Sequence, residues 1–142
     1  PAFEANDMTR TGQASPVVEG IGRPRVEGSF MPDVIDRMMA VPDAASVAGC
    51  RWLERVLGRR CGPSTGTNIV GALSLAAEMI ARGEQGSIVT LICDSGERYA
   101  DTIYDEAWLA AKGVDVMPWT QRFQTLTDKG QWSSDGLAQA YR

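Results

Sequence analysis

The chain has 142 residues, of which 44% are hydrophobic and 23% are charged, and its formal net charge is −4. This profile is typical of one globular domain that is long enough to bury a core. The acidic balance, and basic pairs without interleaved aromatic residues, argue against nucleic-acid binding. Because the sequence contains no histidine, it excludes Ser-His-Asp and Cys-His catalytic centres and every metal site that needs imidazole.

The cysteine usage and the apolar runs indicate the compartment. Cys50, Cys61 and Cys93 are odd in number and include no Cys-x-x-Cys pair, so we expect neither a disulfide framework nor a metal site. The most apolar run, residues 69–77, is too short to cross a bilayer, and the first residues given contain no charged region that leads into an apolar one. We therefore expect a cytoplasmic protein without membrane contact. Because the sequence begins at Pro1 rather than methionine, we also expect it to be a fragment.

The first third of the chain predicts a loop, a strand and a helix. Residues 1–16 are rich in polar and turn-forming residues and read as loop. Residues 37–41 could form a short strand, after which Asp43 is a candidate helix N-cap. Apolar residues at helical spacing predict a helix over about residues 44–57, and Gly58 supplies a stop.

A second helix is predicted to begin in the segment Gly-Pro-Ser-Thr-Gly-Thr-Asn, residues 62–68, and to end near Gly83. It is apolar almost all round, which is typical of a helix buried between layers. Its start offers free backbone N–H groups and the positive end of the helix dipole to an anion or a polar ring atom. The alternative, that Ser64 or Thr65 merely caps the helix, stays open. The segment matches neither a Walker A loop nor the dinucleotide fingerprint.

Residues 87–93 (Ser-Ile-Val-Thr-Leu-Ile-Cys) predict an interior parallel strand covered on both faces. The polar turn that follows lies where open α/β sheets bind their ligands. In that turn Asp94 and Glu97 could form an acid–base pair, although the adjacent Arg98 and the turn more often indicate an ion pair and a cap. The spacing of Thr102 and Asp105 predicts a capping box that opens a further helix, ending near residues 112–113.

The order of these elements indicates an α/β fold, with a parallel sheet flanked by helices. Residues 114–142 mix aromatic and polar residues with no dominant period, and no structure is assigned to them.

Three motifs in one order carry a family resemblance. They are Gly20-Ile21-Gly22, the serine segment 62–68, and Asp-Ser-Gly-Glu-Arg-Tyr at residues 94–99. Together they resemble the C-terminal region of the cysteine synthase and cystathionine β-synthase family, which are fold-type II (tryptophan synthase β-like) enzymes that use pyridoxal 5'-phosphate (PLP). The resemblance covers about residues 17–113. It implies that residues 1–113 form the C-terminal portion of the PLP-binding large domain, and that residues 114–142 form a tail of unassigned structure.

The resemblance also implies roles for four residues toward the cofactor. Ser64 matches the serine whose hydroxyl meets the pyridine nitrogen of PLP. A neutral hydroxyl does not protonate that nitrogen as a carboxylate would, so the cofactor is a milder electron sink that favours β-elimination over transamination. Gly20 and Gly22 would let the backbone pass close to the cofactor and substrate, and Asp94 would organise the turn beside Ser64. No catalytic residue and no metal ligand is expected in this chain.

The lysine that carries PLP and the Gly/Thr phosphate loop of the family both lie N-terminal to the matched region. The chain contains two lysines, Lys112 and Lys129, and neither has the sequence context of the family's lysine. We therefore expect this chain alone to be inactive, with PLP bound covalently only by the missing N-terminal part of the same protein. The expected assembly is a homodimer.

The implied reaction acts on L-cysteine or O-acetylserine by β-elimination or β-replacement through aminoacrylate. An L-cysteine desulfhydrase would release hydrogen sulfide, pyruvate and ammonia, whereas a cysteine synthase would form cysteine. Cys93, where the family often has proline, Pro63 and Thr65 in the serine loop, and Glu19, where synthases commonly have glutamine, depart from the family pattern and leave both reactions open. The alternative is a non-catalytic binding or regulatory module, which the missing lysine alone supports.

Overall fold

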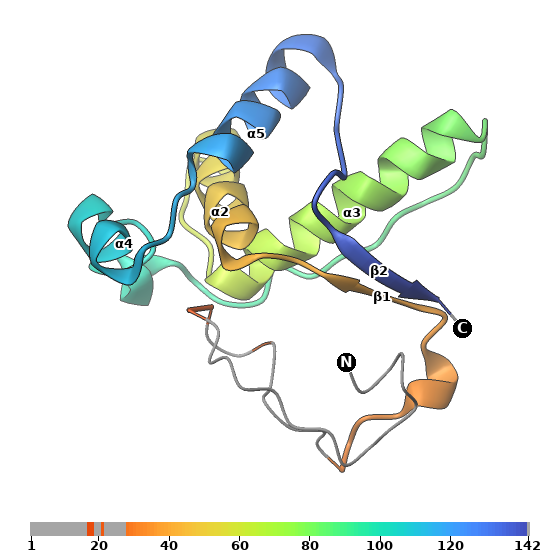
Figure 1. Cartoon of the computed structure of the whole chain (residues 1–142), viewed down its shortest axis with the longest axis horizontal. Coiled ribbons are helices and arrows are strands. Elements are labelled where there is room, and N and C mark those ends of the chain that lie inside the picture. The colour runs from red at the N-terminus through yellow and green to blue at the C-terminus, as the bar shows by residue number, and fades with distance from the viewer. Residues whose placement is uncertain (1–16, 19–20, 22–27, 142) are drawn as a thin grey trace.

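The computed structural model describes residues 17–18, 21 and 28–141. In chain order the described elements are η1 (Pro32–Val34), β1 (Arg37–Ala40), α2 (Asp43–Leu57), α3 (Pro63–Ala81), η2 (Glu97–Tyr99), α4 (Glu106–Lys112), α5 (Met117–Lys129) and β2 (Ala138–Tyr141). Helices α2, α3 and α5 gather in the middle, α4 lies to one side, and β1 and β2 lie below α3 (Figure 1). The described residues thus have an α/β architecture in which helices predominate.

Helices α2 and α3 cross closely because glycines stand at the crossing. A Cβ atom on Gly66 would lie 1.9 Å from the backbone oxygen of Ser46, and one on Gly49 would lie 2.9 Å from the backbone oxygen of Gly66. The hydroxyls of Ser46 and Thr67 share a hydrogen bond of 2.7 Å across the same contact. Only hydrogen atoms at the two glycines permit this approach, which fixes the first turns of α3 against α2.

Residues 114–142, which the sequence left unassigned, contain α5 and β2. Phe123 of α5 is fully buried and its ring stacks on Trp52 of α2 at a centroid distance of 5.3 Å. Trp132, after α5, packs against Phe123 at 5.0 Å and donates an indole N–H to the hydroxyl of Ser74 in α3 at 3.0 Å. The tail is therefore joined to both central helices through an aromatic cluster.

The sheet of the described residues is a two-stranded antiparallel pair, β1 with β2, in which Met39 lies opposite Gln139. Arg37 of β1 makes a bidentate pair with Glu78 of α3, with N–O distances of 2.7 and 2.6 Å. The predicted strand at residues 37–41 is confirmed. The pair does not confirm the expected parallel sheet.

The described structure does not confirm the covered strand that the sequence predicts at residues 87–93. No strand is present there, and the segment returns along α3 as an extended chain (Figure 1). Val89 is 90% exposed and Leu91 is 69% exposed. A strand requires hydrogen-bonded neighbours, and no described segment pairs along this one.

The predicted helices are confirmed with small changes at their ends. Helix α2 ends at Gly58, whose φ of 67° is left-handed, as expected of a stop. Its N-cap is Pro42 rather than Asp43, whose carboxylate instead accepts the backbone N–H of Val17 at 2.6 Å. None of the helices that the structure describes is long and apolar enough to cross a membrane.

The capping box predicted at Thr102 is wrong, because α4 begins later, at Glu106. The Thr102 hydroxyl donates to the backbone oxygen of Tyr99 rather than accepting from a helical N–H group. Asp105 is the true N-cap, and its carboxylate accepts the backbone N–H of Trp108 at 2.6 Å.

Candidate functional site

Ser64 lies in the first turn of α3, immediately after the N-cap Gly62 and Pro63. Its side chain is half-buried, and within the described part of the chain its hydroxyl makes no hydrogen bond. Helix α3 has no side-chain cap bond, so the interpretation of Ser64 or Thr65 as a helix cap is wrong. The Ser64 hydroxyl is thus available to a ligand at the positive end of a long helix.

Asp94 lies directly over Gly62. Its backbone oxygen accepts the N–H of Gly62 at 2.9 Å, and Cys61 and Ser95 form an antiparallel bridge next to it. A Cβ atom on Gly62 would lie only 1.7 Å from Asp94 Oδ1, so any larger residue there would displace the Asp94 carboxylate. The Asp94 turn therefore lies close to the start of α3, as expected.

The Asp94 carboxylate accepts a hydrogen bond from the Tyr99 hydroxyl at 2.9 Å. Glu97 is exposed, and its backbone N–H contacts the Ser95 hydroxyl at 3.4 Å. Arg98 lies over the Tyr99 ring at 5.1 Å. The structure therefore favours Asp94 as a turn-organising acceptor, and in the region it describes no hydrogen bond joins Asp94 to Glu97.

Tyr104 closes the other side of this turn, a role that its sequence context did not indicate. Its hydroxyl donates to the backbone oxygen of Cys61 at 2.8 Å and accepts the backbone N–H of the same residue at 3.0 Å. Burial raises the pKa of Tyr104 well above its ordinary value, so the hydroxyl remains a donor at neutral pH.

Cys50 supports the same loop from α2. Its thiol donates to the backbone oxygen of Gly62 at 3.2 Å. Burial raises the pKa of Cys50 to about 12, and burial also raises the pKa of Cys61. Both thiols are therefore neutral at physiological pH, which suits packing and not nucleophilic chemistry.

Two further side chains of α3 hold the segment that leads into Asp94. The Thr65 hydroxyl accepts the backbone N–H of Cys93 at 3.0 Å. The Asn68 side-chain amide donates to the backbone oxygen of Leu91 at 3.1 Å and lies 3.5 Å from the Cys93 sulfur. Sequence reasoning missed this role, since both contacts span more than 20 residues and leave no local signal.

Of the other expected residues, Gly20 and Gly22 lie outside the described residues. Lys112 ends α4, with its ammonium 5.7 Å from the centre of the Trp108 ring, and Lys129 is the last residue of α5. Both lysines are exposed and belong to elements other than the one that carries Ser64. Among the described residues, no hydrogen bond or ion pair joins either lysine to the start of α3.

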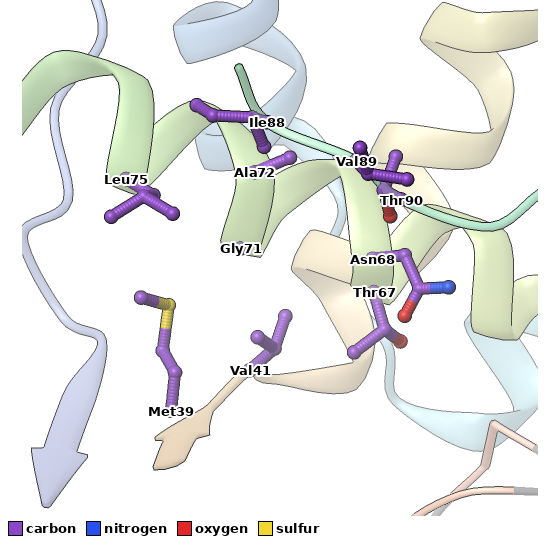
Figure 2. Close-up of a pocket in the computed structure, with 10 residues that line it drawn as sticks. All are labelled: Met39, Val41, Thr67, Asn68, Gly71, Ala72, Leu75, Ile88, Val89 and Thr90. Atoms are coloured by element: carbon purple, nitrogen blue, oxygen red, sulfur yellow. The ribbon is translucent and has the colours of Figure 1, made fainter. Parts of the chain in front are cut away.

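An apolar groove of about 300 Å³ runs along α3 between β1 and the segment at residues 88–90. Figure 2 shows Met39 of β1 and Leu75 of α3 facing each other across it, with Asn68 near one end beside Thr90. Titratable side chains are absent from its lining in the described structure. The groove therefore offers packing surface, whereas the polar chemistry lies at the start of α3.

The chain is similar to several characterised enzymes, although no family model matches it. It is 56% identical over 115 residues to an L-cysteine desulfhydrase of Mycobacterium tuberculosis, a match that covers 81% of this chain and 31% of the relative. It is 34% identical to cysteine synthase 2 of Schizosaccharomyces pombe, covering 78% of this chain and 28% of the relative. A third relative, at 39% identity, is an N-(2-amino-2-carboxyethyl)-L-glutamate synthase of Ralstonia nicotianae, and the match covers 64% of this chain and 26% of that enzyme.

These relatives are metabolic enzymes, and two of the three are named for cysteine. The chain belongs to the cysteine synthase and cystathionine β-synthase family of fold-type II PLP enzymes, as its three motifs indicate. It spans about 30% of the length of the curated relatives that it matches.

Proposed function

We propose that this chain supplies the part of a PLP site that meets the pyridine ring, in an enzyme that cleaves the Cβ–S bond of L-cysteine. The observation that carries the proposal is the Ser64 hydroxyl, which is half-buried and without a partner in the described structure. The identity of 56% to an L-cysteine desulfhydrase favours elimination over replacement. The balanced reaction converts L-cysteine and water to pyruvate, ammonia and hydrogen sulfide.

The residues present suit the pyridine end of the cofactor. When bound, PLP withdraws electrons from the α-carbon of an amino-acid substrate. The Ser64 hydroxyl would donate a hydrogen bond to the ring nitrogen while keeping its own proton. The positive end of α3 at the same place disfavours a protonated, cationic ring nitrogen. Both effects keep the ring neutral, which suits elimination better than transamination.

The remaining assignments concern the surroundings of Ser64. Asp94 would fix the turn next to Ser64 through Gly62 and Tyr99, and the backbone at Gly20 and Gly22 would approach the cofactor and substrate. The two lysines of this chain end α4 and α5, so the covalent attachment of PLP is assigned to the remainder of the full-length enzyme.

We also propose where this chain lies in the fold of the full-length enzyme. Residues 1–113 would form the C-terminal portion of the large domain, within which residues 87–93 become an interior strand of a parallel sheet. The exposed apolar side chains of that segment support this placement, since sheet neighbours would cover them. The N-terminal part of the protein would supply those neighbours, and the complete enzyme would be a cytoplasmic homodimer.

An assay of the purified full-length protein tests the function. With L-cysteine it should release sulfide and pyruvate in equal amounts, and with O-acetylserine plus sulfide it should form little cysteine. Faster cysteine formation than pyruvate formation would assign a synthase, and inactivity with both substrate sets would overturn the proposal. The relatives are enzymes, which removes the support for a non-catalytic module.

A further inference from the structure

Two side chains of α3 form hydrogen bonds with backbone groups of the segment that leads into Asp94. Thr65, which is 3% exposed, accepts the N–H of Cys93 at 3.0 Å, and Asn68 donates to the C=O of Leu91 at 3.1 Å. Thr65 and Asn68 are three residues apart, so they lie on one face of the helix. Together they contact the backbone on either side of Ile92.

In an extended chain, the C=O of one residue and the N–H of the residue two positions later point to the same side. In a parallel ladder these two groups bracket one residue of the neighbouring strand. Here the Thr65 hydroxyl and the Asn68 amide take the place of that neighbour. Strand pairing on this side of the segment therefore cannot continue past Leu91.

Residues 91–94 are also bonded to a residue that precedes Ser64 in the sequence. The backbone oxygen of Asp94 accepts the N–H of Gly62, two residues before Ser64. Bonds from residues 62, 65 and 68 thus fix residues 91–94 to the start of α3. Ser64 lies between these attachment points, and its hydroxyl has no partner among the residues that the structure describes.

We propose that Thr65 and Asn68 are positioning residues of the Ser64 site: they end strand pairing at Leu91 and fix the segment that leads into Asp94 relative to the Ser64 hydroxyl, which would meet the cofactor ring. This inference rests on the proposed function. The two adjacent hydroxyls thus have different roles. The Thr65 oxygen accepts the Cys93 N–H, whereas the Ser64 hydroxyl has no partner in the described structure and would bind the cofactor ring. Ligands of open α/β sheets bind at such a place, beyond the carboxyl end of a strand.

The test compares variants of the full-length protein. Thr65→Val keeps the shape of the side chain and removes the acceptor, Thr65→Ser keeps the acceptor, and Asn68→Ala removes the amide from a solvent-accessible position. Thr67→Val is the matched control, because the hydroxyl that it removes bonds to Ser46 of α2 and to the backbone oxygen of Pro63 and makes no bond to the 91–93 segment. Amide hydrogen exchange at Cys93, absorbance of bound PLP, and turnover of L-cysteine are measured for each.

Thr65→Val should speed exchange at Cys93 by about fivefold, the effect of losing one hydrogen bond. It should also shift the PLP absorbance and lower kcat, whereas Thr65→Ser should restore all three readouts. Asn68→Ala should shift the absorbance in the same direction, and Thr67→Val should change neither exchange at Cys93 nor absorbance.

Unchanged exchange at Cys93 in Thr65→Val would overturn the proposal, as would faster exchange with unchanged absorbance and kcat. A wild-type protein without bound PLP would overturn the proposed function instead, and the exchange at Cys93 would then still decide whether Thr65 and Asn68 hold the segment.

Discussion

Neighbouring hydroxyls in the serine loop have different surroundings. Thr65 is buried and bonded to the backbone of Cys93, whereas Ser64 is half-buried and unbonded within the described structure. A substitution at Ser64 therefore removes no hydrogen bond of the described structure. Its effects should appear in catalysis and leave stability unchanged.

Ser64→Ala in the full-length enzyme should lower kcat with L-cysteine by about tenfold, because one hydrogen bond to the cofactor is lost. The absorbance of bound PLP should shift, while the melting temperature should stay within about 1 °C of wild type, since the Ser64 hydroxyl makes no hydrogen bond within the described structure. Steady-state kinetics and thermal unfolding measure these effects. A large loss of stability with unchanged kcat would show that Ser64 is structural.

Cys50 should make the protein less stable in alkali. Burial raises the pKa of Cys50 to about 12, so the folded protein holds this proton more tightly than the unfolded chain, whose thiol has the ordinary pKa of 9.0. The stabilisation is complete below pH 9 and is lost as pH rises toward 12. Denaturant unfolding at a series of pH values between about pH 8 and about pH 10.5 measures this change in the free energy of unfolding.

The control for this prediction is Cys50→Ser, whose hydroxyl can still donate to Gly62 and does not titrate in this range. The decline of stability with pH should be shallower in Cys50→Ser than in wild type. Tyr104, whose pKa burial also raises, contributes the same sign in both proteins. Identical declines would contradict the account of Cys50.

At the scale of elements, the crossing of α2 and α3 sets the position of the serine loop. Gly66→Ala places a methyl group 1.9 Å from the backbone oxygen of Ser46, which cannot move without shifting α2. The free energy of unfolding of the full-length enzyme should fall by about 3 kcal/mol, the upper range for overpacking. Gly71→Ala is the control in the same helix, because a Cβ there meets nothing within 4 Å.

Gly71→Ala should be neutral or stabilising by up to about 1 kcal/mol, since alanine is the better helix former. Denaturant unfolding followed by circular dichroism compares the two variants. Equal stabilities would mean that the close α2–α3 approach does not constrain the fold.

Local signals explain which elements the sequence predicted. The helices at 43–57 and 63–81 were visible because apolar periodicity and the stops at Gly58 and Gly83 are local. Helix α5 was missed because polar residues surround its two buried aromatics, Trp119 and Phe123, although their i, i+4 spacing was a usable signal. Sheet pairing was not predictable, since the partner of β1 lies about 100 residues away.

Local motifs likewise predicted only part of the candidate site. Ser64 and the Asp94 turn were found from motifs, and the structure brings them together at the start of α3. The supporting contacts of Thr65, Asn68 and Tyr104 were not found, because each joins segments more than 20 residues apart. The residue type at one position does not indicate which distant residue its side chain will contact.

At the scale of the whole molecule, the exposed apolar segment 87–93 predicts how the isolated chain behaves. Val89, Leu91 and the groove beside α3 present apolar surface of the kind that drives association. The 142-residue chain expressed alone should be poorly soluble or aggregate, as measured by size-exclusion chromatography. Co-expression with the remainder of the enzyme should recover it, and a cooperatively unfolding monomer would contradict this prediction.

We propose that this chain contributes Ser64 to a PLP site whose lysine lies elsewhere in the enzyme. Borohydride reduction of the purified full-length protein, followed by peptide mapping in a mass spectrometer, tests it most directly. We expect a PLP–lysine adduct on a peptide outside these 142 residues. An adduct on Lys112 or Lys129, or no adduct in a protein that turns over L-cysteine, would contradict it.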